Sequence, residues 1–483
     1  MAPSSGLPSS GLPSSEPRPC ELPLYELPLV RAGRAVRSAQ TLALAGVDGT
    51  PLATVHQAPP LLARLTVAEV REHCAGQDPD SAPDPALLRR AGRLFATATL
   101  GGLTPERYCE LQARAAGVPV SVARHSLTDV ARTFANAGAR IAAECPPGAT
   151  GVISPGEVSA VWARRGEVLA VIAPSNNPGT HTQWLTALAC GYALLVRPGA
   201  RDPFTPARMI DALLRAGVPP HLLSLLPGSH ATGDALVEAA DLSLVFGGDA
   251  AARRYGHDRR VILRGPGRSK LLHSGPVTDE VLDVICDSVG HDAGMRCTNA
   301  TAVFTDGDPR ALARAVAARL APLTPAPPQS DEARLPVLPL AEARALREHL
   351  TRRLDGAVDV AAAHYPDGPL ADLGDGSAAL RPAVLLCERA DHPGARVELS
   401  FPCVWVLPWR RSQGMAPLRD TLALTVLSDD PALAREALRE RSIRKVLFGP
   451  VPTWSAGEVS PHDGYLSHEL MEARGYGVAD RLL

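Results

Sequence analysis

The sequence predicts an α/β fold in which parallel sheets carry helices on both faces. Between residues 167 and 246, short apolar runs of strand length alternate with helical segments, and most runs end near a Gly or Pro turn. A less regular version of the same alternation occupies residues 270–440. Strands that alternate with helices at this spacing form doubly wound parallel sheets. We therefore expect two doubly wound α/β domains.

The elements of the first domain follow one another closely. Continuous apolar runs predict strands over four ranges, 167–173, 192–197, 222–226 and 242–246. Helices are predicted at 183–189 and 234–240, and a further helix is predicted to begin at Pro206 and to stop at Gly217. Upstream, residues from about 65 to 145 are predicted to be mostly helical, because apolar residues recur there at helical spacing.

Three segments differ in composition from these elements. The first 18 residues repeat Ser-Ser-Gly-Leu-Pro, a low-complexity pattern that predicts a disordered tail. Residues 152–162 contain small and β-branched residues around a Pro-Gly turn, which predicts an extended hairpin. The tail from Lys445 is rich in Gly and Pro and has few apolar runs. We expect it to cover the surface or to join subunits rather than to form a core.

The composition favours a small-molecule substrate. The 483 residues include 49 basic and 51 acidic ones, a net charge of −2, so nucleic acid and anionic membranes are not attracted. The chain has neither an apolar run long enough to span a bilayer nor a basic–apolar leader, which predicts a cytoplasmic protein. The nine cysteines are scattered without any CxxC pair. We therefore expect neither a disulfide framework nor a metal site.

The most informative residue is Cys297, in the run Gly294-Met-Arg-Cys297-Thr-Asn. It comes after the predicted nucleotide-binding region. At this position its thiolate can attack a carbonyl carbon and hold the acyl group as a thioester. His291, six residues earlier, is a candidate for removing the thiol proton. The alternative is that Cys297 is a small buried apolar residue, which is the commoner role of an unpaired cysteine.

Asn176 lies in the run Pro174-Ser-Asn176-Asn-Pro178, directly after the predicted strand 167–173. Ligands bind at the carboxyl edge of parallel sheets. A side-chain amide at that edge, together with the backbone N–H of Cys297, can donate hydrogen bonds to the oxyanion of a tetrahedral intermediate. The alternative is an ordinary turn, because Asn and Pro are common turn formers.

Three further runs predict a cofactor edge. Arg197-Pro198 ends the second predicted strand, and a guanidinium there can hold ribose hydroxyls or a phosphate. The run Gly228-Ser-His-Ala-Thr-Gly233 precedes a predicted helix, whose N-terminus can meet a pyrophosphate. Phe246-Gly247-Gly248 ends the fourth strand, and its glycines would let a nicotinamide approach the backbone. A solvated arginine and plain turns are the alternatives.

Taken in order, these segments resemble the aldehyde dehydrogenase superfamily. The Asn176 run is similar to that family's Pro-Trp-Asn-Phe-Pro loop, and the Arg197 run to its strand ending in Lys-Pro. Phe246-Gly247-Gly248-Asp249 is similar to its Phe-Thr-Gly-Ser turn, and the Cys297 run to its Gly-Gln-x-Cys. Glu398 with Phe401 is similar to Glu-x-Phe-Gly-Pro, although Glu398 stands three residues before the Phe rather than two.

The resemblance implies a role for each of these residues. Cys297 would be the nucleophile and Asn176 the oxyanion donor. Arg197 would contact the ribose of the cofactor, and Glu398 the nicotinamide ribose. The implied fold is aldehyde-dehydrogenase-like, with two doubly wound α/β domains and a small β-hairpin and C-terminal element for oligomerisation. A homo-oligomer, either a dimer or a tetramer, is implied because family members pair through that hairpin.

The same resemblance sets the expected domain boundaries. A disordered tail would occupy residues 1–20, and the nucleotide-binding domain would comprise 21–150 and 164–268. The catalytic domain would run over 269–454, with the oligomerisation arm and tail at 151–163 and 455–483.

One departure from the family pattern concerns the general base. Hydrolytic members carry a Glu in a Glu-Leu-Gly-Gly-Lys segment, where this chain reads Leu263-Arg264-Gly-Pro-Gly-Arg-Ser-Lys270. With Arg264 in place of that carboxylate, water is poorly activated to attack a thioester. This is similar to the CoA-dependent, luciferase-associated acyl reductase branch, as is the tail run Pro461-His-Asp-Gly-Tyr465.

We therefore expect a reductase that uses NADPH or NADH to convert an acyl- or aryl-CoA thioester into an aldehyde, with CoA as co-substrate. Arg197 favours NADPH, because a guanidinium suits a 2′-phosphate. Three alternatives stay open. The first is NAD(P)-dependent oxidation of an aldehyde to an acid, with His291 or Asp292 as base. The second is delivery of the acyl group by an adenylating or acyl-carrier partner protein. The third is a non-catalytic scaffold, against which the pair of Asn176 and Cys297 argues.

Overall fold

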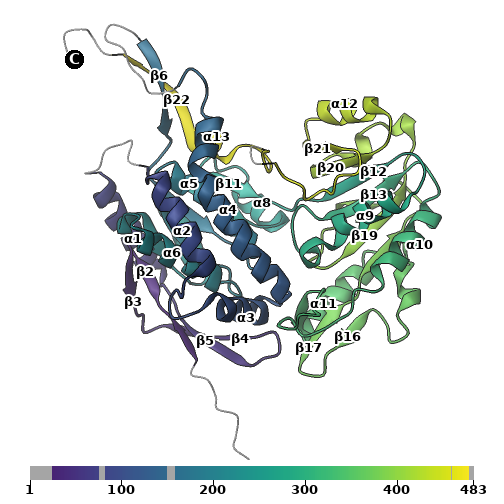
Figure 1. Ribbon diagram of the computed structural model, residues 1–483, viewed down its shortest axis with the longest axis horizontal. Coiled ribbons are helices and arrows are strands. Elements are labelled where there is room, and N and C mark those ends of the chain that lie inside the picture. The colour runs from purple at the N-terminus through teal and green to yellow at the C-terminus, as the bar shows by residue number, and fades with distance from the viewer. Residues whose placement is uncertain (1–23, 76–81, 150–157, 458–459, 478–483) are drawn as a thin grey trace, which may run out of the picture.

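The computed structural model describes residues 24–75, 82–149, 158–457 and 460–477. The predicted disordered tail at 1–20 lies outside these residues. Two seven-stranded sheets dominate the described structure. In Figure 1, the purple-to-teal elements surround the first sheet and the green-to-yellow elements surround the second.

The first sheet is parallel over the strands that the apolar runs predict. Its order is β11-β10-β7-β8-β9-β2-β3, and β2 and β3 are antiparallel additions at one edge. The strands are β11 (Val261–Arg264), β10 (Leu242–Phe246), β7 (Val168–Ile172), β8 (Ala193–Arg197), β9 (Leu223–Leu225), β2 (Leu29–Arg31) and β3 (Arg34–Val36). Four of the five residues in each of β7 and β8 are buried, as expected for strands covered on both faces.

Helices pack around this sheet, and all of them except α8 contribute buried residues to one core with it. They are α1 (Pro60–Cys74), α2 (Pro85–Thr97), α3 (Pro105–Ala116), α4 (Val120–Glu144), α5 (Thr182–Ala189), α6 (Phe204–Ala216), α7 (His230–Ala239) and α8 (Asp249–Tyr255). The predicted helical region is thus confirmed as α1 to α4. A three-stranded sheet, β1-β5-β4, was not predicted; its strands are β1 (Tyr25–Leu27), β5 (Pro51–His56) and β4 (Thr41–Ala45).

Two predicted helix starts are wrong. Helix α6 begins at Phe204 rather than at Pro206, and its first turn is capped by Asp202, whose carboxylate accepts the N–H of Thr205. Helix α7 begins at His230 rather than at residue 234, because the extended backbone ends at Ser229. Gly233 therefore lies inside the helix and not in the loop before it.

The second sheet has the order β15-β18-β19-β13-β12-β20-β21 and is parallel except at β15. Its strands are β15 (Val358–Asp359), β18 (Ala383–Leu386), β19 (Cys403–Pro408), β13 (Ala300–Thr305), β12 (Ser269–His273), β20 (Thr421–Leu427) and β21 (Ile443–Phe448). Helices α9 (Asp279–Gly290), α10 (Pro309–Leu320) and α12 (Pro431–Arg439) accompany it. A small antiparallel sheet lies beside it with helix α11 (Leu340–Thr351); the strands are β14 (Val337–Pro339), β17 (Ser377–Leu380) and β16 (Leu370–Asp372). The predicted second α/β region is confirmed.

The C-terminal segment returns to the first sheet. Strand β22 (Met471–Gly477) pairs antiparallel with β6 (Val158–Arg164), from Met471 opposite Arg164 to Gly477 opposite Val158. Residues 152–157 of the predicted hairpin lie outside the described structure, and the described strand of that region pairs with the tail. Helix α13 (Leu466–Leu470) precedes β22, and its Leu466 and Leu470 are buried in the first core, contrary to the expectation for the tail.

In Figure 1 the ribbon of β6 and β22 projects beyond the helices, and the yellow segment before α13 runs between the two sheets. That segment therefore reaches the region between the two α/β domains.

None of the helices in the described residues is both long and apolar enough to cross a bilayer.

Candidate active site

The predicted site residues meet because parallel strands end at a common edge. Ile172, the last residue of β7, lies opposite Arg197, the last residue of β8. At the other side of β7, Phe246 of β10 lies opposite Arg264 of β11. The loops that carry Asn176, Arg197 and Phe246 therefore leave the first sheet at its carboxyl edge, as the sequence predicts.

Cys297 lies in a tight turn between a 3₁₀ helix, η3 (His291–Gly294), and β13. Two glycines fix this turn by close approach. A Cβ on Gly294, whose φ is +70°, would lie 2.6 Å from the nitrogen of Pro402. A Cβ on Gly267 would lie 1.7 Å from the carbonyl oxygen of Cys297. The side chain of Cys297 is partly exposed, so it is not one of the buried apolar cysteines.

Asn176 lies in the loop after β7 and contacts the turn that carries Cys297. Its Nδ2 donates a hydrogen bond of 2.8 Å to the carbonyl of Met295, two residues before the cysteine. The neighbouring Asn177 accepts the N–H of Gly179 and begins the 3₁₀ helix η1 (Pro178–His181). The structure thus brings Asn176 and Cys297 together. Because a side-chain amide carries two N–H bonds, one of them is left for an oxyanion.

The imidazole that contacts the sulfur belongs to His462, which the sequence analysis did not select. Its Nε2 lies 3.3 Å from Sγ of Cys297, and its Nδ1 lies 3.4 Å from a carboxylate oxygen of Asp463. Burial lowers the pKa of His462, but the Cys297 thiolate and Asp463 outweigh it and raise the pKa to about 9. An imidazolium beside a cysteine stabilises its thiolate. The sequence signal was a His-Asp pair within the tail run 461–465.

The bases considered from the sequence have other contacts. His291 stacks on Trp454 with ring centroids 3.9 Å apart, and its ring nitrogens lie 3.8 Å from the carboxylates of Asp287 and Asp292. Asp292 in turn forms an ion pair with Arg296. The structure therefore gives the position beside the sulfur to His462 rather than to His291 or Asp292.

Arg264 is buried at the end of β11 and faces the tail. Its Nε lies 3.3 Å from Asp463, and the guanidinium also pairs with Glu469. The same Nε donates to the side-chain oxygen of Gln183 at 3.2 Å. Arg264 thus binds the segment that carries His462.

Two of the predicted cofactor residues, Arg197 and Phe246, end strands β8 and β10 at the carboxyl edge of the first sheet. Arg197 donates from Nε to the carbonyl of Gly228 at 3.1 Å, and burial lowers its pKa. A Cβ on Gly233 would lie 3.6 Å from the side chain of Arg197, so the first turn of α7 lies against this arginine. A Cβ on Gly248 would meet nothing within 4 Å. The backbone at Gly248 therefore leaves space for a flat ring. The N-terminus of α7 and the guanidinium of Arg197 would suit the phosphates of a dinucleotide.

Glu398 and Phe401 lie behind the nucleophile's turn. Glu398 accepts the N–H of Arg268 at 2.8 Å, and burial raises the pKa of its carboxyl group. Phe401 is buried, and its carbonyl carbon packs against Gly294. Both residues thus support the Cys297 turn, while the contact of Glu398 with a ribose stays a prediction.

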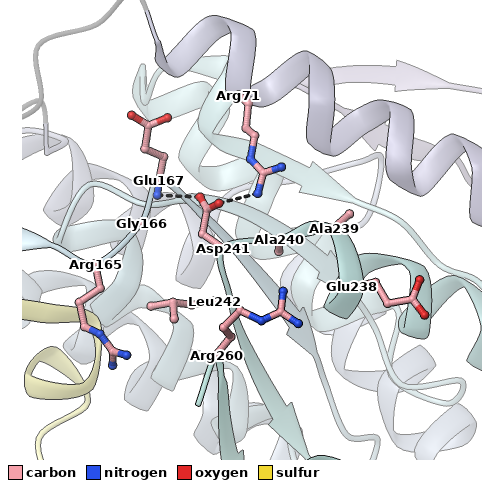
Figure 2. A pocket seen from close by; sticks show the side chains of 10 residues that line it. All are labelled: Arg71, Arg165, Gly166, Glu167, Glu238, Ala239, Ala240, Asp241, Leu242 and Arg260. Carbon is pink, nitrogen blue, oxygen red and sulfur yellow. Dashed lines mark hydrogen bonds and ion pairs between the residues drawn. The ribbon is translucent and has the colours of Figure 1, made fainter. Parts of the chain in front are cut away.

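A depression of about 680 Å³ lies at the opposite edge of the first sheet, where β7 and β10 begin. Figure 2 shows Asp241 in its centre, bound to Arg71 and to the N–H of Glu167. The cations around it have partners: Arg165 donates to the carbonyl of Glu469, and Arg260 pairs with Asp258. Ligand sites of parallel sheets lie at the carboxyl edge, so the candidate site is the region of Cys297.

Comparisons with known proteins agree with this geometry. A family model described as "Aldehyde dehydrogenase family" matches residues 48–421. The N-succinylglutamate 5-semialdehyde dehydrogenase of Escherichia coli strain CFT073 is 34% identical over 178 residues, which are 32% of this chain and 35% of that protein. Malonate-semialdehyde dehydrogenase 3 of Geobacillus kaustophilus is 28% identical over 151 residues, 29% of this chain and 31% of that protein. Each match thus spans about a third of the relative's length.

Solved structures are similar over nearly the whole chain. An indole-3-acetaldehyde dehydrogenase in complex with NAD+ has a TM-score of 0.80 at 19% identity, covering 94% of this chain and 97% of that chain. The aldehyde dehydrogenase KauB from Pseudomonas aeruginosa has the same four values. At this identity the likeness establishes the fold.

Proposed function

Because the chain belongs to the aldehyde dehydrogenase family, we propose that it oxidises an aldehyde with a nicotinamide dinucleotide through a thioester on Cys297. The single observation that carries the proposal is the partly exposed sulfur held 3.3 Å from an imidazole nitrogen, beside the Asn176 loop. Relatives named as semialdehyde dehydrogenases favour oxidation over the CoA-thioester reduction expected from Arg264.

In the first half of the reaction, the residues of this chain act on the aldehyde carbon. The Cys297 thiolate attacks this carbon, and the imidazolium of His462 balances the thiolate before the attack. The free N–H of Asn176 stabilises the resulting oxyanion. Arg197, Gly233 and Gly248 would hold the nicotinamide dinucleotide, which when bound would supply the hydride acceptor.

The decisive experiment measures NADH and NADPH formation by absorbance with a panel of aldehydes, including aldehydes that carry a second carboxylate. We expect formation of the reduced dinucleotide without any added thiol. Turnover only in the presence of a thiol would reject hydrolytic oxidation.

A second candidate is reduction of an acyl thioester, and Arg264 is the observation that favours it. The same assay, run in reverse with acyl- and aryl-CoA thioesters with and without an acyl-carrier protein, tests this candidate. Consumption of NADPH faster than aldehyde oxidation would establish the reductive direction.

A further inference from the structure

The tail segment 460–465 carries the one imidazole whose contact with the nucleophile's sulfur is described. His462 comes from the far end of the chain, 165 residues after Cys297. Its second nitrogen, Nδ1, and the facing oxygen of Asp463 are buried and lack hydrogen-bond geometry with any other described group. Nε2 of His462 is thus the ring nitrogen that faces the sulfur, and Asp463 lies beside the other nitrogen, Nδ1.

Arg264 explains why this segment lies there. The guanidinium occupies the place where the family pattern has a carboxylate base, and it binds Asp463 and Glu469 instead. Arg164 and Arg165 flank the same tail: the N–H of Arg165 donates to the carbonyl of Leu470 at 3.0 Å. The tail is therefore held at both ends of α13, with His462 above the sulfur.

From these contacts we infer that His462 is the general base for release of the acyl group from Cys297, in place of the missing carboxylate. The inference deepens the proposed function and rests on it, because it needs a thioester at Cys297. Arg264 is a neighbour that fixes the segment and does not touch the reacting atoms.

The step balances with water as the acyl acceptor. The water oxygen forms a bond to the acyl carbon, and its proton moves to Nε2 of His462. The carbon–sulfur bond breaks, and the sulfur leaves as a thiolate. The product is the carboxylic acid, and the site returns to the thiolate–imidazolium pair.

Acylation of Cys297 favours the neutral form of His462, which is the form that a general base needs. In the free enzyme the thiolate and Asp463 raise the pKa of His462 against the opposing effect of burial. Acylation neutralises the sulfur, so one cause of the raised pKa is lost while burial remains. Lys445, whose pKa is lowered by burial and raised by Cys297, and Arg264 are cations facing the same cluster. Both oppose protonation of His462, which favours the neutral base in the acyl-enzyme.

The test uses p-nitrophenyl acetate, an acyl donor that acylates a thiolate without cofactor or aldehyde. Intact-mass spectrometry follows the acetyl group on the full-length protein, and p-nitrophenolate absorbance follows the burst. In His462→Gln we expect the acetyl adduct to persist, with deacylation slowed about 100-fold. The wild-type deacylation rate should rise with pH as His462 loses its proton, and the His462→Gln rate should lose this dependence.

His468→Gln is the matched control. This histidine lies on the same tail in α13 and contacts the carbonyl of Glu144, away from the sulfur. We expect wild-type deacylation and the same melting temperature. Thermal melting of His462→Gln checks its fold, and added imidazole should restore deacylation in His462→Gly.

The outcomes separate the two proposals. An adduct that leaves His462→Gln at the wild-type rate would overturn the role of His462 and leave the thioester mechanism standing. If neither the wild-type protein nor His462→Gln releases p-nitrophenolate or carries an acetyl group on Cys297, the proposed function is overturned together with this inference.

Discussion

Two histidine–aspartate pairs use the same groups in different surroundings. His181 and Asp202 lie 3.3 Å apart, and both side chains are completely buried. The ring of His181 also accepts the N–H of Trp184, and Asp202 accepts the N–H of Thr205. His462 and Asp463 lie at a similar separation of 3.4 Å, but they are partly exposed and face the sulfur of Cys297.

The two pairs differ in the group that the histidine contacts besides its aspartate, which we call the third partner. In the His181 pair every further contact is to a backbone or indole N–H within the core, so the pair joins η1 to the start of α6. In the His462 pair the further contact is the sulfur of Cys297, the nucleophile of the proposed function. The comparison teaches that proximity of an imidazole and a carboxylate indicates stability in one setting and reactivity in the other. Four predictions test this division.

The largest effect is expected for Cys297→Ala, which removes the third partner of the His462 pair. Aldehyde turnover should fall by at least about 10⁴-fold, because no other group forms the thioester. The melting temperature and cofactor binding, measured by NAD(P)H fluorescence, should be unchanged. Residual turnover above about a hundredth of wild type would remove the covalent mechanism.

Asp202→Asn breaks the buried pair while keeping its shape. The unfolding free energy should fall by about 3 kcal/mol, because an interior imidazole loses its charged partner. Denaturant titration measures this loss. Turnover should stay within about threefold of wild type; a large loss of turnover with intact stability would show that the His181 pair also serves the reaction.

Asp463→Asn makes the corresponding change in the exposed pair. Here we expect turnover to fall about tenfold, because Asp463 raises the pKa of His462 and orients its ring. The unfolding free energy should change much less than in Asp202→Asn. Equal effects of the two substitutions on stability would contradict the division drawn here.

The smallest effect is electrostatic and needs no catalysis. In Cys297→Ala the pKa of His462 should lie below its value of about 9 in the wild-type protein, since the thiolate that raises it is gone and burial still lowers it. The imidazolium should therefore be lost at a lower pH in the variant. Nuclear magnetic resonance of the histidine ring protons during a pH titration measures the shift. An unchanged pKa would mean that the sulfur and the imidazole do not interact.

Local patterns predicted the first sheet well. The runs at 167–173, 192–197 and 242–246 became β7, β8 and β10, because a strand buried on both faces needs a continuous apolar run. Helix starts were predicted less well. The start of α6 depends on the Asp202 carboxylate, which accepts the N–H of Thr205, and the start of α7 depends on the extended backbone at Ser229. Strands of three residues such as β1 and β2 carry too short a pattern to be recognised.

The site was predicted in part for the same reason. Asn176 follows one contiguous apolar strand and Arg197 ends the next, so motif order was enough to place both at the carboxyl edge, and a hydrogen bond from Asn176 to Met295 links this edge to the Cys297 turn. His462 lies in the tail run 461–465, which the sequence analysis noted, but its contact with Cys297 spans 165 residues and no local pattern indicates it. Arg264 was correctly recognised as a departure from the family pattern, but its contacts with Asp463 and Glu469 depend on how the tail folds back.

The distance along the chain between sulfur and imidazole has a kinetic consequence. Contacts between remote residues form late, because closing a long loop costs entropy before any contact is gained. The thiol of a half-folded chain therefore lacks the imidazolium that activates it until β22 has paired with β6 and α13 has docked. Under the proposed function, we therefore expect the Cys297 thiol to become reactive only once the C-terminal segment has docked.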